Sequence, residues 1–172
     1  MKIYTGKAFM LSIVAVNVAC GTSLKVMSDY DKNIDFKRYK TFAVDTVRIN
    51  ETLNQLNISR ITNAVKADLV KKGFTENISG PDFKVSAAAI VKDKQSMAGN
   101  TDYYSEATRY TTYNLQNYKD GSLLVDIADA KTNKLVWEGI GNKQVNKPIK
   151  DPDKEIPAMV TSIMAGFPPK EN

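Results

Sequence analysis

Apolar residues recur at three- and four-residue steps in two segments of the chain. The first segment covers residues 56–70 and is followed by Gly73, a residue that commonly ends a helix. The second covers residues 156–167 and is followed by two prolines at 168–169, which cannot continue a helix. Because this spacing places the apolar side chains on one face, the pattern predicts two amphipathic helices that pack on a common core.

Alternation of residues between an apolar face and a second face predicts strands. It is seen at residues 39–47, 83–89, 122–128 and 134–141. The last two are joined by a tight connection at 129–133, which makes them the clearest hairpin in the sequence. On the first strand of this hairpin we expect Leu123, Val125 and Ile127 to form an apolar face. On the second strand we expect Leu135 and Trp137 to lie on the same face as each other.

The middle of the chain has a different composition. Residues 93–102 show no periodicity and are expected to form a loop, and Lys119-Asp120-Gly121 is typical of a turn. Between them, residues 108–115 are rich in threonine and tyrosine and are expected to form an edge strand. The order strand, helix, strand, strand, hairpin, helix predicts an α+β fold. We expect a mixed or antiparallel sheet of about five strands with two helices packed on one face.

The N-terminus resembles a secretion signal. Two lysines and no acid in residues 1–7 precede nine apolar or small residues, 8–16, and a short segment that leads to the only cysteine, Cys20. Nine residues are too few to cross a bilayer as a helix, which takes roughly 20. The segment Asn17-Val18-Ala19-Cys20-Gly21 resembles a bacterial lipobox, although leucine is favoured where Asn17 stands. This resemblance implies cleavage before Cys20 and a lipid on its sulfur.

These features predict the organisation of the chain. Residues 1–19 form the lipoprotein signal peptide, 20–35 a lipidated tether, 36–169 a single α+β domain, and 170–172 a tail. The position after the cysteine is Gly21 and not the aspartate that retains lipoproteins at the inner membrane of enteric bacteria. We therefore expect an outer membrane lipoprotein that faces the periplasm.

Composition excludes several functions. The chain carries 24 basic and 19 acidic residues, and the net charge of +5 falls to +3 when Lys2 and Lys7 leave with the signal. That charge is too small and too scattered to predict nucleic-acid binding. The sequence has no histidine, and lipid would occupy its one thiol. We therefore expect no catalytic residue of the usual triads, no metal site and no cofactor.

Two groups of residues remain as candidate sites. Tyrosine offers rigid amphipathic contact area, so we take the tyrosines of the middle segment as a candidate surface for an envelope protein or a glycan. An edge strand whose tyrosines shield the sheet is the simpler alternative. The acids of the hairpin region are the second group, and turn formation with a solvated strand face explains them better than a cation site or a carboxylate pair. The tyrosines are Tyr103, Tyr104, Tyr110, Tyr113 and Tyr118, and the acids are Asp120, Asp126, Asp129 and Glu138.

Several short segments together resemble DUF4136, a family of uncharacterised bacterial envelope lipoproteins. They include Ser28-Asp29-Tyr30-Asp31, Lys72-Gly73-Phe74, Pro81-Asp82-Phe83, the block from Gly121 to Gly139, and Phe167-Pro168-Pro169. The segments occur in the family's order and cover residues 28–169. The resemblance implies the fold and an envelope location, and it implies no activity.

We therefore expect a membrane-anchored lipoprotein with a non-enzymatic binding or scaffolding role, whose membrane partner is the lipid on Cys20. One rival hypothesis is a hydrolase of envelope polymers that uses carboxylates. Another is a structural accessory subunit of an envelope complex.

Overall fold

The structure is a computed structural model, which describes residues 23–49, 55–105, 108–145 and 149–170. Within these ranges it places the backbone, but not the side chains, of residues 46–49, 98–105, 108–114 and 116. The elements are β1 (Lys25–Tyr30), η1 (Phe36–Arg38), β2 (Thr41–Ile49), α1 (Gln55–Lys71), β3 (Thr75–Glu76), β4 (Phe83–Ser105), β5 (Thr108–Asp129), β6 (Leu135–Val145) and α2 (Pro152–Met164).

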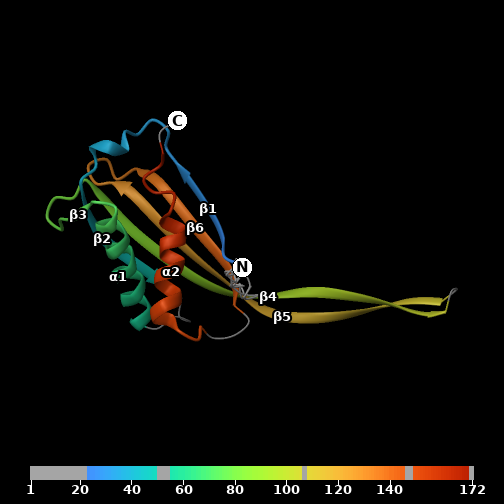
Figure 1. Cartoon of the computed structure of the whole chain (residues 1–172). Helices are drawn as coiled ribbons and strands as arrows, with labels where there is room; N and C mark the ends of the chain where they lie inside the picture. The colour runs from blue at the N-terminus through green and yellow to red at the C-terminus, as the bar shows by residue number, and fades with distance from the viewer. Residues whose placement is uncertain (1–22, 50–54, 106–107, 146–148, 171–172) are drawn as a thin grey trace, which may run out of the picture.

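The strands form one mixed sheet in the order β1-β6-β5-β4-β2-β3. The pairs of β2 with β3 and with β4 are parallel, and the other neighbours are antiparallel. Both helices lie on the same face of this sheet (Figure 1). The α+β class and the mixed sheet with two helices on one face are thus confirmed, with six strands where we expected about five.

Two strands account for most of the difference from the sequence expectations. β4 has 23 residues and β5 has 22, and they pair along almost their whole length. The expected loop at 93–102 and the expected turn at 119–121 were therefore wrong, since both lie inside continuous strands. Cross-strand hydrogen bonds satisfy the backbone groups of these residues. Because neither face of the ribbon is buried there, the sequence needs no alternation of apolar and polar residues.

The N-terminal part of the sheet also differs from expectation. β1 lies within residues 20–35, which we expected to be a tether, and it pairs with β6 from Lys25 opposite Asn142 to Tyr30 opposite Trp137. The domain therefore begins before residue 36. The described chain enters the sheet as an edge strand.

The core lies between the sheet and the helices. The covered face of β5 carries Leu123, Val125 and Ile127, which are all buried as the alternation predicted. From the helices come Val65, Leu69, Val160, Ile163 and Met164, and from the rest of the chain Phe42, Phe83, Val85, Trp137 and Phe167, each with at most 1% of its surface exposed.

Local chemistry explains how these elements end and approach one another. Gly73 has φ +91° and closes α1, a conformation that favours glycine. Gly141 lies under α2, where an added Cβ would be 2.7 Å from Cδ1 of Ile163. The absence of a side chain at this position lets the helix approach the sheet closely.

The shared face that we expected for Leu135 and Trp137 was wrong. The register between β5 and β6 shifts next to Ile127, which pairs with Trp137, while Ala128 pairs with Leu135. This bulge turns Trp137 into the core and leaves Leu135 52% exposed.

Candidate functional site

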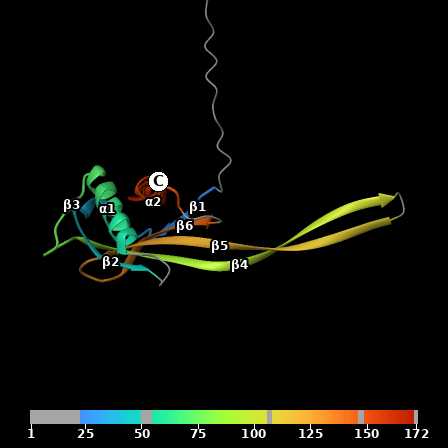
Figure 2. The same ribbon diagram turned by 90° about the horizontal axis from the view of Figure 1, so that it is seen from below.

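A projecting hairpin is the most distinctive feature of the surface. β2 pairs with β4 only as far as Ala89, and β6 pairs with β5 only as far as Lys119. Beyond these points residues 94–105 and 108–118 pair, among the described residues, with each other alone, and we call them the arm. Figure 2 shows the arm extending well past the helices and the rest of the sheet. At about 3.3 Å per residue, residues 94–105 span about 36 Å.

The candidate tyrosines lie on the arm. Tyr103 and Tyr104 belong to β4, and Tyr110 and Tyr113 to β5, where Tyr110 pairs with Asp102 and Tyr113 with Gly99. Their side chains lie outside the described part of the structure. The fifth, Tyr118, is half-buried at the base of the arm, opposite Lys94. The structure thus collects all five on one hairpin.

Two apolar side chains face solvent next to this group. Met97 and Leu115 are directly opposite each other in the ladder and are 70% and 67% exposed. Leu115 lies eight residues before the buried Leu123 in the same strand, so both point to the same side of the ribbon. The side of the hairpin that forms core in the sheet therefore carries an exposed apolar pair on the arm.

Ion pairs brace the base of the arm. Lys94 contacts Asp120 at 2.7 Å and Lys119 contacts Asp93 at 3.1 Å. The two pairs lie on opposite sides of the ribbon because their members alternate along each strand. The hydrogen bond to Asp120 raises the pKa of Lys94. These contacts explain the sequence Lys119-Asp120-Gly121, which serves cross-strand pairing and not a turn.

We call the sheet face opposite the helices the open face. Its middle is apolar, and its part nearer the arm is more polar. Register aligns Ala88, Leu124, Ile140 and Met27 as one apolar row across four strands. On the side of this row toward the arm is a hollow of about 720 Å³. Its polar lining includes Ser23, Lys25, Lys92, Lys94, Tyr118 and Asp120.

The acids of the hairpin region separate into three environments. Asp120 lines this hollow and pairs with Lys94, whereas Asp126 and Glu138 are opposite each other on the open face, outside the hollow. Burial and the charge of Glu138 raise the pKa of Asp126. Within the described ranges, no group of three acidic or other metal-binding side chains is placed to hold a metal ion.

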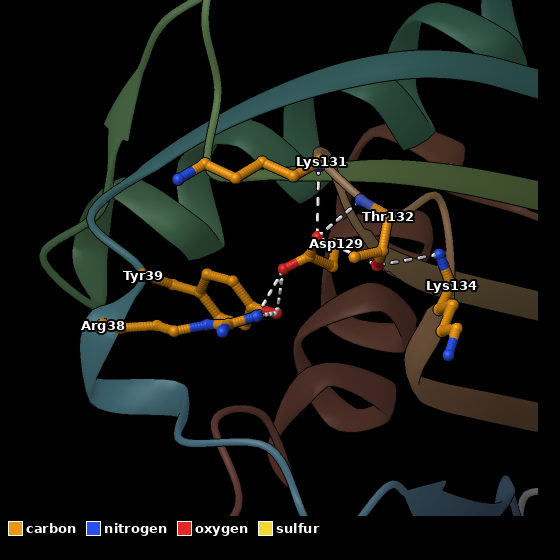
Figure 3. A network of polar contacts seen from close by, with 6 residues as sticks. All are labelled: Arg38, Tyr39, Asp129, Lys131, Thr132 and Lys134. Atoms are coloured by element: carbon orange, nitrogen blue, oxygen red, sulfur yellow. Dashed lines mark hydrogen bonds and ion pairs between the residues drawn. The ribbon is translucent and has the colours of Figure 1, made fainter.

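Asp129, the fourth acid, is the centre of a structural network at the far end of the sheet (Figure 3). Its Oδ1 accepts hydrogen bonds from the backbone N–H groups of Lys131 and Thr132 and from the Thr132 hydroxyl, at 3.1, 2.8 and 3.0 Å. Its Oδ2 accepts from the hydroxyl of Tyr39 at 3.0 Å and from the guanidinium of Arg38. Asp129 therefore fixes the β5–β6 turn onto the chain before β2.

The pKa of Asp129 follows from these contacts. Burial alone would raise it, but the hydrogen bonds from Thr132 and Tyr39 and the charge of Arg38 lower it to about 2. The sequence does not predict this network, because Arg38 and Asp129 are 91 positions apart. Asp82 has a similar role, since its Oδ2 accepts from the backbone N–H groups of Lys40 and Thr41, each at 2.9 Å.

Cys20, the expected site of lipid attachment, lies outside the described residues. Neither α1 nor α2 combines the length and the apolar character that crossing a bilayer requires.

Comparison with known proteins places the domain. The model of a domain of unknown function, DUF4136, matches residues 26–169. The chain belongs to the DUF4136 family. The family resemblance noted in the sequence is thereby confirmed, and the match begins inside β1. No curated protein gives a significant match to this chain.

Solved structures share the fold of this DUF4136 domain. A PDZ domain protein from Parabacteroides distasonis is 18% identical, with a TM-score of 0.59 over 88% of this chain, which spans 38% of that protein. PelC from Paraburkholderia phytofirmans, solved as a dodecamer, is 9% identical, with a TM-score of 0.51 over 83% of this chain and 96% of PelC. A DUF4136 family protein from Bacteroides thetaiotaomicron is 12% identical, with a TM-score of 0.49 over 84% of this chain and 94% of that one. The first two likenesses, at identities this low, show a common fold and nothing further.

Proposed function

We propose that this chain is a membrane-anchored envelope lipoprotein with a non-enzymatic binding role, in which the arm is the binding element. Residues 1–19 are the signal peptide, and lipid on Cys20 holds the DUF4136 domain at the periplasmic face of the outer membrane. The lipobox-like segment Asn17-Val18-Ala19-Cys20-Gly21 and the absence of a second cysteine support the anchor.

The observation that carries the binding role is the lack of support along the arm. A two-stranded ribbon is marginally stable in water unless a third strand or a helix covers it. Within the described residues the arm has neither, and both of its edges are open. Open edges are usually protected by lysine, proline or bulges. From Gln95 to Ser105 and from Thr108 to Asn117, the arm contains no lysine and no proline. A partner that lies against the arm would supply the missing support.

Mass spectrometry of the mature N-terminus tests the anchor. We expect the purified chain to begin at Cys20 with a mass increase that corresponds to diacylglycerol and an N-acyl chain, and the Cys20→Ala variant to lack that increase. A mature chain that begins at another residue without lipid would overturn the lipoprotein assignment.

Limited proteolysis in the envelope tests the arm. Trypsin cleaves after Arg109 near the tip and after Lys131 and Lys134 in the exposed β5–β6 turn, which serves as the internal control. We expect cleavage at Arg109, relative to the turn, to be at least about tenfold slower in intact envelopes than in the detergent-purified protein, because a bound edge opens less often. An unchanged ratio would show that the arm has no partner in the envelope and would refute the binding role.

A scaffold assembled from copies of this chain is a second candidate. It is favoured by the fold shared with PelC from Paraburkholderia phytofirmans, which was solved as a dodecamer. Light scattering of the protein in mild detergent would decide this point. A fixed multiple of the monomer mass supports the scaffold, and a monomer at all concentrations counts against it.

A further inference from the structure

The described chain enters the sheet beside the base of the arm. Lys25, the first residue of β1, is opposite Asn142 of β6, which is opposite Ser122 of β5, which in turn is opposite Ile90 of β4. This row is close to Lys94, where the arm begins. In Figure 1, β1 starts at the point where β4 and β5 leave the sheet and runs away from the arm.

The number of residues before β1 limits how far the domain can be from an anchor. Lys25 is five positions after Cys20. In any conformation, five steps along the chain span at most about 17 Å. If Cys20 carries lipid, as proposed above, the arm end of the sheet is therefore held close to the bilayer.

The arm carries few charges, which suits a position at the lipid headgroups. Its two strands contain only Asp102 and Arg109 as charged residues between positions 95 and 117, apart from the connection at 106–107.

The apolar part of the arm suits the same boundary. Met97 and Leu115 form an exposed pair, and four tyrosines follow toward the tip. Tyrosine is enriched where one end of a side chain is apolar and the other is hydrated, as at a membrane interface. At that depth water and headgroups hydrate the open strand edges.

We infer that the arm lies on the surface of the bilayer that carries the anchor. In this arrangement Met97 and Leu115 reach the boundary between headgroups and acyl chains. The inference rests on the proposed lipidation of Cys20 and names the partner of the arm. The short connection to the anchor favours the membrane over a second copy of the chain, because it brings the base of the arm to the bilayer in every molecule.

A fluorescent label on the lipidated full-length protein tests this orientation. Lipid would occupy the thiol of Cys20, so a cysteine introduced by Leu115→Cys is the single reactive thiol for a pyrene label. Ile78→Cys is the matched control, because Ile78 is 79% exposed and follows β3, at the end of the sheet opposite the arm. Both proteins are reconstituted into vesicles of phosphatidylethanolamine and phosphatidylglycerol that contain nitroxide-labelled lipid.

We expect the lipid nitroxide to quench the pyrene at position 115 at least about threefold more strongly than the pyrene at position 78. Equal quenching at the two positions would overturn the inference. A pyrene excimer band at position 115 without lipid quenching would also overturn it, since it would place the arm against a second copy.

One further measurement separates the possible failures. The intact mass of the same preparations reports lipidation. A chain without lipid refutes the proposed function and this inference with it, whereas a lipidated chain with equal quenching refutes the orientation alone.

Discussion

The two halves of the β4–β5 hairpin share the same pair of strands and differ in what surrounds them. From Phe83 to Ala89 and from Leu123 to Asp129, the strands have neighbours on both sides and helices on one face. In the arm the same ladder continues, and no other described part of the chain pairs with it or covers it as a helix. Backbone hydrogen bonds hold the two strands together in both halves. Only the covered half is also stabilised by the burial of apolar surface. The comparison indicates that the covered half serves stability and that the arm serves contact.

A matched pair of leucines should produce the largest contrast between the halves. Leu123→Ala removes a side chain that is 4% exposed, whereas Leu115→Ala removes one on the same side of the same strand that is 67% exposed. We expect Leu123→Ala to lower the free energy of unfolding by about 2–5 kcal/mol, since it leaves a cavity in the core. For Leu115→Ala we expect a change within about 0.5 kcal/mol. Urea denaturation followed by the fluorescence of Trp137 measures both. A similar loss in the two variants would show that the arm contributes to the core of the isolated protein.

The sequence predicted the covered half well for the same reason. Leu123, Val125 and Ile127 alternate with Leu124, Asp126 and Ala128, and only the first three lie on the face that the helices bury. The arm has no such requirement, so residues 93–102 carried no pattern and were mistaken for a loop. Strand propensity, from tyrosine and threonine, was the only signal left in the arm, and it identified the segment at 108–115.

Other features were missed because they depend on contacts between distant residues. The contact of Arg38 with Asp129 joins residues that are 91 positions apart in the sequence. The bulge beside Ile127 reverses the expected orientation of Leu135, and local sequence gives no sign of it. The tyrosine group was found as a composition, but only the register shows that its members share one hairpin. Residue pattern thus predicts what local burial controls, and it misses what long-range pairing controls.

Substitution of Asp129, at the end of the hairpin remote from the arm, should lower the unfolding free energy by an intermediate amount. Asp129→Asn keeps the size of the side chain and removes the charge that Arg38 contacts, while leaving the backbone N–H donors of the turn. We expect a loss of about 2–4 kcal/mol in unfolding free energy, because a buried charged hydrogen bond is broken. Asp93→Asn, at the base of the arm, is the control, because the Asp93 side chain is 83% exposed and its pair with Lys119 is a surface one.

The pH dependence sharpens this prediction. The pKa of Asp129 in the folded protein is about 2, below the value of about 3.9 in an unfolded chain. A depressed folded pKa gives stabilisation that is complete above about pH 4 and is lost as the pH falls toward 2. The difference in stability between wild type and Asp129→Asn should therefore shrink from pH 6 to pH 2 by about 2 kcal/mol, as measured by urea denaturation at each pH. A constant difference over this range would contradict the assigned role of the carboxylate.

The ion pair at the base of the arm should give the smallest effect, and a local one. In Lys94→Met the apolar part of the side chain stays and the contact with Asp120 is lost, while the covered half of the hairpin keeps all its neighbours. We expect no measurable change in urea midpoint, but amide hydrogen exchange in residues 95–105 should accelerate by about two- to fivefold, as befits an exposed ion pair. Exchange at Val125 and Ile127 should stay at the wild-type rate. Because salt screens exposed charges, 1 M NaCl should bring the wild-type arm close to the variant. If exchange instead accelerated equally in both halves, the hairpin would open as one unit, and the division between a covered half and an independent arm would be wrong.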